Sequence, residues 1–364
     1  MTTSVLTRAC GPFAGFRPLG RLALVAALLG AAALAFAHDK RPIPPDPVHD
    51  AEGHTRQKIE HRLSPEIYMQ SPFSGRGAMT APAPTAGSTA AASSPISYHG
   101  GAVMPSLSKV VIIWYGNWKQ KNNTDTAAGQ QIIRDAIYGM SVPNAVSNYS
   151  GITTGYGSVL GQYTDSSGAA VSQASSATLV EYTQAASAAY GGKRLTDASV
   201  FALVKAYAGT GDPNAIYLVL SSSDIAESSG FLTKYCGWHS YGTVGSNKVK
   251  YGFIGNPNKS LSACAVQTVS PNGNAAVDGM ISVIAHELVE AVTDPYLNAW
   301  YNASGAENSD MCSWTFGSQL KLTNGAYWNV TLPTRTGGTR NYLLQRQLGV
   351  ADSKCYINAT GPVQ

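Results

Sequence analysis

Runs of apolar residues along the chain predict the strands of a sheet. Lys109 to Trp114 is an unbroken apolar and β-branched run, as in a strand that is buried on both faces. Ala215 to Leu220 has the same character. Lys248 to Ile254 alternates, which favours an antiparallel strand. Ser158 to Thr164 and Ala177 to Tyr182 are weaker strand candidates. The pattern therefore predicts a sheet with at least two central strands.

Helical spacing of apolar residues appears in Gln130 to Met140, in Ala198 to Tyr207 and, most clearly, in Val277 to Pro295. In the last of these the apolar positions 277, 280, 281, 284, 288 and 292 form one stripe. Asn274 is a suitable N-cap. Pro295 disfavours helical geometry at the residue before it, so we expect this helix to end there.

The order of these elements predicts a single α/β domain with a mixed sheet, beginning near Tyr98. We expect a smaller C-terminal lobe after residue 295, with a hairpin around Asn324-Gly325 and a final strand within Asn341 to Gln347. The fold class expected is zincin-like, because the last helix carries a His-Glu pair that is considered below.

Residues 1–37 have the pattern of a secretory signal. Arg8, Arg17 and Arg21 precede or begin an apolar run that ends in Ala35-Phe36-Ala37, a small-residue cleavage pattern. The run is too short for a membrane anchor, so we expect a secreted protein with no membrane association after cleavage. Residues 38–97 are rich in Pro, Gly, Ala and Ser, which predicts a disordered linker or a pro-segment.

Charge and cysteine content change once the signal is removed. The whole chain has a net charge of +4, but the signal holds three arginines and no acids, which leaves 22 basic against 21 acidic residues. Nothing in this balance points to nucleic acid. Cys10 is lost with the signal, and four cysteines remain. An even number in an exported chain predicts two disulfides. Of the three possible pairings we favour Cys236–Cys264 and Cys312–Cys355, which join sequence neighbours.

The candidate chemistry lies in the helix from Val277 to Pro295. His286 and Glu290 are four residues apart and project from one face of the helix. Glu287 is the next residue after His286, so its side chain lies beside that face. The pattern is that of a His-Glu-x-x-His zinc helix with the second histidine replaced by Glu290. Glu287 would then be the general base. A richer carboxylate set makes Mn²⁺ or Ca²⁺ competitive with Zn²⁺. The alternative is a buried histidine beside two solvated acids.

Further ligands are expected downstream. Glu307 and Asp310 lie about twenty residues beyond His286, an arrangement that resembles the third-ligand segment of thermolysin-type zinc peptidases. Glu307 is the preferred third ligand, and Asp310 is a ligand or a partner of His286. Asp294 is another candidate ligand, two turns on from Glu287, although we prefer for it the role of ending the helix before Pro295. His239 is a candidate for stabilising an oxyanion, or else a loop histidine. Six aromatic residues could line a sugar-binding groove or belong to the core: Trp114, Tyr115, Trp118, Trp238, Trp300 and Tyr301.

Several short segments together resemble the phosphate-induced or EXORDIUM-like family of secreted proteins. They are Tyr98-His99-Gly100-Gly101, Ile113 to Trp118, Leu220 to Asp224, Cys236-Gly237, Pro271-Asn272-Gly273 with Val277 to Met280, and Tyr342-Leu343-Leu344. The resemblance covers the predicted core from about residue 98 onward. It implies an extracellular or cell-wall protein whose family is connected with growth and has no established molecular activity.

Two functional hypotheses follow. The first is a secreted zincin-like metallopeptidase that binds Zn²⁺, or Ca²⁺ or Mn²⁺ in its place, and acts on a peptide or protein substrate. The second is a non-catalytic extracellular binding protein of the EXORDIUM-like type, with cell-wall carbohydrate as the expected partner and any metal structural.

Overall fold

The computed structural model describes residues 47–49, 55–57, 59–62, 96–105, 107–142, 158–171 and 177–357. All of them belong to one compact unit, Ile43–Gln364. The predicted signal, residues 1–37, and most of the predicted linker or pro-segment, residues 38–97, lie outside the described residues. Within the described part of the chain, no helix has the length and apolar character needed to cross a bilayer.

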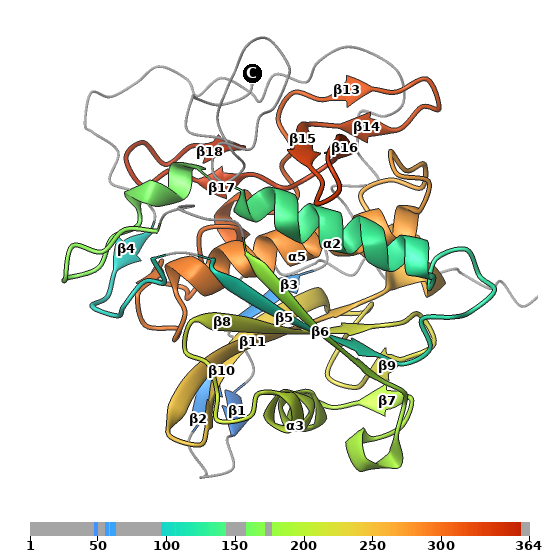
Figure 1. Ribbon diagram of the computed structural model, residues 1–364. Coiled ribbons are helices and arrows are strands. Elements are labelled where there is room, and N and C mark those ends of the chain that lie inside the picture. The colour runs from blue at the N-terminus through green and yellow to red at the C-terminus, as the bar shows by residue number, and fades with distance from the viewer. Residues whose placement is uncertain are drawn as a thin grey trace, which may run out of the picture. The chain divides into compact units, whose positions relative to one another are not determined.

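A six-stranded mixed sheet forms the centre of this unit (Figure 1). Its order is β3-β10-β11-β8-β5-β6. The four strands from β11 to β6 run parallel, whereas β10 is antiparallel to both β11 and β3. The strands are β3 (Ile59–Arg62), β5 (Lys109–Tyr115), β6 (Thr178–Gln184), β8 (Ala215–Ser221), β10 (Tyr235–Val244) and β11 (Asn247–Gly255).

Helices cover both faces of the sheet. Helix α2 (Ala127–Ser141) and helix α5 (Ala275–Thr293) pack on one face, and α3 (Asp197–Tyr207) packs on the other (Figure 1). Successive residues of β5 divide between two cores, with Ile112 facing α2 and α5 and Ile113 facing α3. Both side chains are fully buried, which explains why the predicted central strands read as unbroken apolar runs.

The remaining elements are short. The strands are β1 (Pro47–His49), β2 (Thr55–Gln57), β4 (Ser97–Tyr98), β7 (Arg194–Leu195), β9 (Ala226–Glu227), β12 (Trp300–Tyr301), β13 (Leu320–Lys321), β14 (Tyr327–Trp328), β15 (Val330–Pro333), β16 (Thr339–Tyr342), β17 (Gln347–Leu348) and β18 (Cys355–Tyr356). The helical turns are η1 (Ser158–Gln162), η2 (Ala188–Tyr190), α4 (Leu261–Cys264), η3 (Pro257–Lys259) and η4 (Asp310–Cys312). Pairing of β13 with β14 confirms the predicted hairpin around Asn324-Gly325.

Helix α5 is buried on every side, not along one stripe as its apolar spacing predicted. Its N-cap Asn274 accepts a hydrogen bond from the Val277 amide, and the helix ends at Thr293, just before Asp294-Pro295. Both ends agree with the sequence prediction. The helix is enclosed because it packs against the sheet and α2, and because Ser309 and Gln345 of the C-terminal segments hydrogen-bond to it. Any polar side chain on α5 must therefore find its partners inside the protein.

Both predicted disulfides are confirmed. Cys236–Cys264 joins the first residues of β10 to α4, and Cys312–Cys355 joins η4 to β18. The prediction of a strand from Ser158 to Thr164 is wrong, because Ser158 to Gln162 forms the helical turn η1. Strand β10 was not predicted at all. Its signal was the two-residue turn Gly245-Ser246, which links it to β11 as a hairpin.

Close contact between β10 and α5 gives a first test. A Cβ atom on Gly237 would lie 2.7 Å from Val283 Cγ1 and 3.0 Å from the Phe253 carbonyl oxygen. We expect Gly237→Ala to push the helix from the sheet and to lower the free energy of unfolding by about 1–3 kcal/mol, measured by urea denaturation. The control is Gly161→Ala, where the nearest atom, Val171 O, is 3.8 Å away. Equal midpoints for the two variants would contradict this packing.

Candidate metal centre

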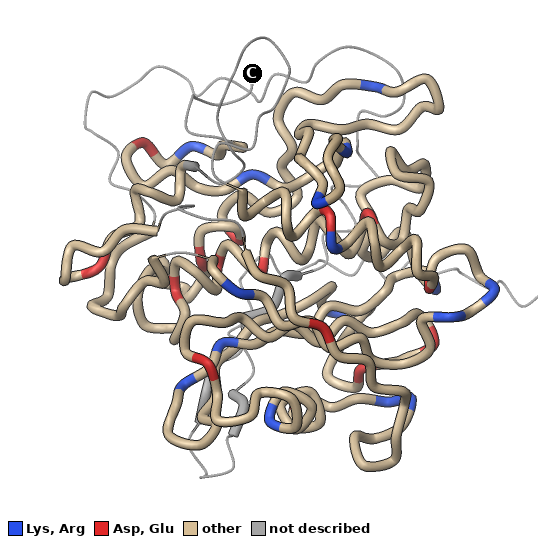
Figure 2. Tube along the Cα trace, in the orientation of Figure 1, with Lys and Arg blue, Asp and Glu red and all other residues tan. Residues whose placement is uncertain are grey.

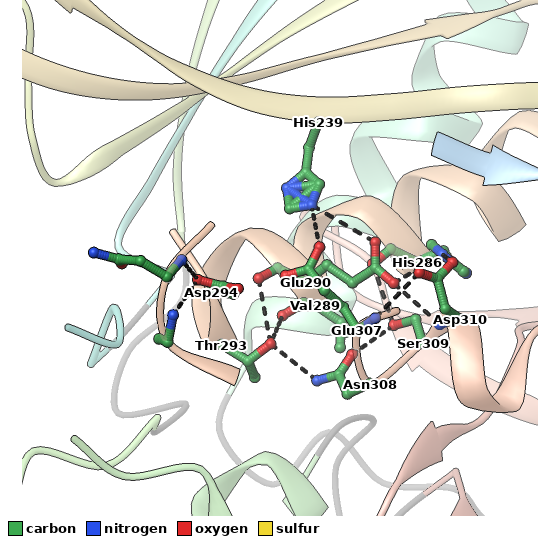
Figure 3. A network of polar contacts seen from close by, with 12 residues as sticks. His239, His286, Val289, Glu290, Thr293, Asp294, Glu307, Asn308, Ser309 and Asp310 are labelled. Atoms are coloured by element: carbon green, nitrogen blue, oxygen red, sulfur yellow. Dashed lines mark hydrogen bonds and ion pairs between the residues drawn. The ribbon is translucent and has the colours of Figure 1, made fainter. Parts of the chain in front are cut away.

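Acidic and imidazole side chains from three elements meet beneath the sheet. His239 comes from β10, His286 and Glu290 come from α5, and Glu307 and Asp310 come from the segment that follows α5 (Figure 3). These residues, with Glu287, are called the acid–histidine cluster below. Figure 2 shows acidic positions along α5 and no Lys or Arg on that helix.

Distances within the cluster are those of direct contact. His286 Nε2 lies 3.0 Å from Glu290 Oε1 and 3.5 Å from Asp310 Oδ1. His239 Nε2 lies 2.7 Å from Glu307 Oε2 and 3.7 Å from Glu290 Oε2. The i, i+4 spacing on α5 produces the first of these contacts. The contacts of His239 depend on the tertiary fold, because residue 239 is 68 positions from Glu307 in the chain.

The cluster is shut off from solvent. His239 is 2% exposed, His286 and Glu287 are 1% exposed, and Glu290 and Glu307 are fully buried. Only the Asp310 side chain, 20% exposed, reaches the surface. No Lys or Arg in the described part of the chain forms an ion pair with Glu290, Glu307 or Asp310. Buried carboxyl groups without a Lys or Arg partner are costly when ionised, so they must be protonated, pair with an imidazolium or bind a cation. Against the lowering effect of burial, Glu290 and Asp310 raise the pKa of His286 well above its usual range, which makes this imidazole the cation of the metal-free cluster.

Backbone and side-chain hydrogen bonds hold the segment after α5 against the helix. The Asp310 amide donates to Glu290 Oε1 at 3.0 Å, and the Glu307 amide donates to Asp310 Oδ2 at 3.1 Å. Asn308 Nδ2 donates to Thr293 Oγ1 at 3.0 Å. Ser309 Oγ donates to the His286 carbonyl. These contacts fix the positions of Glu307 and Asp310 relative to the helix.

Burial and neighbouring charge shift the pKa values of the cluster. Burial raises the pKa of Glu290 to about 7, against the lowering effect of His286. Burial and the nearby carboxyl groups, first among them Asp294, raise the pKa of Glu307 well above its usual range. Burial lowers the pKa of His239 to about 3, so this imidazole is neutral. Neutral imidazole is the form that ligates metals.

The donor atoms form two groups that suit a metal ion. One contains His239, Glu287 and Glu290, the other contains His286, Glu290 and Asp310, and the ligand atoms of each group lie within 4.8 Å of one another. Glu307 contacts His239 and belongs to neither of these two groups, and its role as a third ligand stays a prediction. Asp294 accepts hydrogen bonds from the backbone amides of Asn298 and Ala299, so it supports the loop after the helix.

The aromatic residues proposed as a sugar-binding groove lie mostly in the core. All of them except Tyr301 are buried, with exposures from 0 to 8%. They are Trp114, Tyr115, Trp118, Trp238 and Trp300. For these five side chains the second of the two interpretations, membership of the core, is confirmed, because close packing leaves their rings no open face.

Comparison with known proteins finds one matching family model and relatives that all carry EXORDIUM-type names. Residues 96–355 match the phosphate-induced protein 1 conserved region. Protein EXORDIUM-like 3 of Arabidopsis thaliana is 29% identical over 298 residues, which span 73% of this chain and 82% of that protein. EXORDIUM-like 5 of the same plant is 28% identical over 67% of this chain and 70% of its own length, and EXORDIUM is 27% identical over 68% and 81%. No solved structure matches, so the zincin-like description of the fold stays a prediction.

Replacing one acid of the metal-free cluster tests its energetic cost. We expect Glu307→Gln to raise the free energy of unfolding at pH 7 by roughly 1–3 kcal/mol, because the amide still accepts from His239 and carries no charge. The raised pKa of Glu307 penalises the folded state only as pH rises above the unfolded value. The gain therefore disappears below about pH 4.

The control for this measurement is Asp135→Asn in metal-free protein. Asp135 is 3% exposed and has its own cation, Arg340 Nε, at 2.8 Å. Removing this paired acid should lower stability at pH 7. Loss of stability in both variants, measured by denaturant unfolding, would contradict an uncompensated charge in the cluster.

Proposed function

The chain belongs to the phosphate-induced protein 1 family, and we propose that it is an exported, non-catalytic binding protein that holds a divalent cation inside its fold. The observation that carries the proposal is the burial of the donor set. Two imidazoles and three glutamates are at most 2% exposed, and no Lys or Arg within the described ranges pairs with Glu290 or Glu307, which leaves His286 as the cationic neighbour of Glu290 when no metal is bound. A divalent cation supplies the missing positive charge.

The donor types limit the choice of ion. Imidazole nitrogen together with carboxylate oxygen suits Zn²⁺ or Mn²⁺, whereas Ca²⁺ prefers oxygen ligands alone. In this proposal the bound ion joins His239 on β10 to the two ligands of α5 and to the segment from Glu307 to Asp310. It therefore acts as a cross-link between parts of the chain that are distant in sequence.

Burial also argues against a catalytic role. A catalytic metal keeps an open coordination position that substrate can reach, but in this cluster only Asp310 is partly exposed. Export is supported by the signal-like pattern of residues 1–37 and by the two disulfides, which persist in oxidising compartments.

A metal-dependent peptidase is the second candidate. It is favoured by Glu287, which follows His286 on the helix and has a carboxylate oxygen within 4.8 Å of the donor atoms of His239 and Glu290. In that case a metal held by the cluster would supply Lewis acidity, Glu287 would act as the general base, and His239 would be placed to stabilise developing negative charge.

Removal of the metal tests the structural role. The mature protein should contain Zn²⁺ or Mn²⁺ by elemental analysis, and chelation should lower its free energy of unfolding. For an ion present at 100 to 1,000 times its Kd, the expected loss is about 3–4 kcal/mol. The matched variant Glu290→Gln should bind metal weakly and respond little to the chelator. A protein that contains no ion and is not stabilised by added Zn²⁺, Mn²⁺ or Ca²⁺ would overturn the proposal.

The two candidates differ in their response to Glu287→Gln. The metal-loaded wild type should not cleave casein or a peptide library, and Glu287→Gln should change only metal affinity. If the wild type cleaves casein and Glu287→Gln abolishes cleavage while zinc stays bound, the peptidase reading replaces the structural one.

A further inference from the structure

Glu290 points its two carboxylate oxygens at two different histidines. Oε1 lies 3.0 Å from His286 Nε2, and Oε2 lies 3.7 Å from His239 Nε2 (Figure 3). Within the described ranges, Oε2 has no hydrogen-bond partner although it is fully buried. A carboxylate whose oxygens each face a separate nitrogen donor has the geometry of a ligand that bridges two ions.

The other donors divide on either side of Glu290. On one side, His239 contacts Glu307 at 2.7 Å and shares a ligand-distance group with Glu287. On the other side, His286 lies 3.5 Å from Asp310. Each side thus has its own imidazole and at least one carboxylate of its own. Neither group contains both histidines.

The charge of the cluster supports more than one ion. Glu287, Glu290, Glu307 and Asp310 would together carry four negative charges when ionised. One divalent cation compensates half of them, and two compensate all four. Glu307 is fully buried and lies on the His239 side, with its Oε2 2.7 Å from His239 Nε2. Uncompensated carboxylates in such a place are expensive.

We propose that the acid–histidine cluster holds a pair of divalent transition-metal ions, Mn²⁺ or Zn²⁺, bridged by Glu290. His239 and Glu287 bind the first ion, with Glu307 in contact with His239, and His286 and Asp310 bind the second. A bridging carboxylate keeps such ions about 3.5–4 Å apart. The inference rests on the proposed function, since it requires that the cluster binds metal, and it adds the number of ions and the ligands of each.

The test is a titration of the metal-stripped full-length chain with Mn²⁺, followed by elemental analysis and electron paramagnetic resonance. Two Mn²⁺ per chain with an exchange-coupled spectrum are expected. One Mn²⁺ per chain with the spectrum of an isolated ion would overturn the pair but leave the proposed function standing. No bound Mn²⁺ or Zn²⁺ would overturn both.

Variants assign the ligands. Asp310→Ala removes a ligand of the second ion alone, at the most exposed position of the cluster, and should leave one ion with an isolated spectrum. His239→Ala should likewise leave one ion, on the other side. The control is Asp278→Asn, which changes an acid on α5 that accepts hydrogen bonds from Ser270 and Asn272. This variant should still bind two ions. Two coupled ions in Asp310→Ala would overturn the assignment, and the wild-type count is decisive if a variant does not fold.

Discussion

The energetic cost of burying carboxyl groups is the constraint on which the rest of this structure depends. Glu287, Glu290 and Glu307 are almost completely removed from solvent. Helix α5 leaves them no route outward, because it is enclosed by the sheet, by α2 and by the C-terminal segments. Each ionised carboxylate in such a place costs several kcal/mol unless it is paired. Strand β10, α5 and the segment from Glu307 to Asp310 therefore depend on one another, because the buried acids of one element contact the imidazoles of another.

The covalent structure reinforces the same three elements. Cys236 lies in β10 three residues before His239, and its disulfide anchors the strand to α4. Cys312 lies two residues after Asp310, and its disulfide anchors that turn to β18. Every element that contributes a side chain to the cluster from outside α5 is thus held close to a cross-link. The match to the phosphate-induced protein 1 region, residues 96–355, includes all of these cysteines and the whole cluster.

The sequence predicted local features well and long-range contacts poorly. β5 and β8 were predicted because both faces of these strands are buried, and α5 was predicted with its N-cap and its end before Pro295. The contact of His286 with Glu290 follows from helical spacing alone. The contact of His239 with Glu307 does not, because it requires an antiparallel strand that is rich in Gly and Tyr and was not recognised. Among the six aromatic residues, Trp114 belonged to a run already predicted to be buried, whereas Trp118, Trp238, Trp300 and Tyr301 had no local signal to separate a groove from the core.

Strand β3 completes the sheet from outside the region that defines the family. It pairs with β10 through Ile59 to Arg62, whereas the matched region begins at residue 96. β10 would otherwise be an edge strand, with a row of backbone amides and carbonyls open to pairing. A protein trimmed to the conserved region exposes that row beside His239. Such a truncation favours self-association through shared strands, so the boundary chosen for expression determines whether the short β3 or the long β10 forms this edge of the sheet.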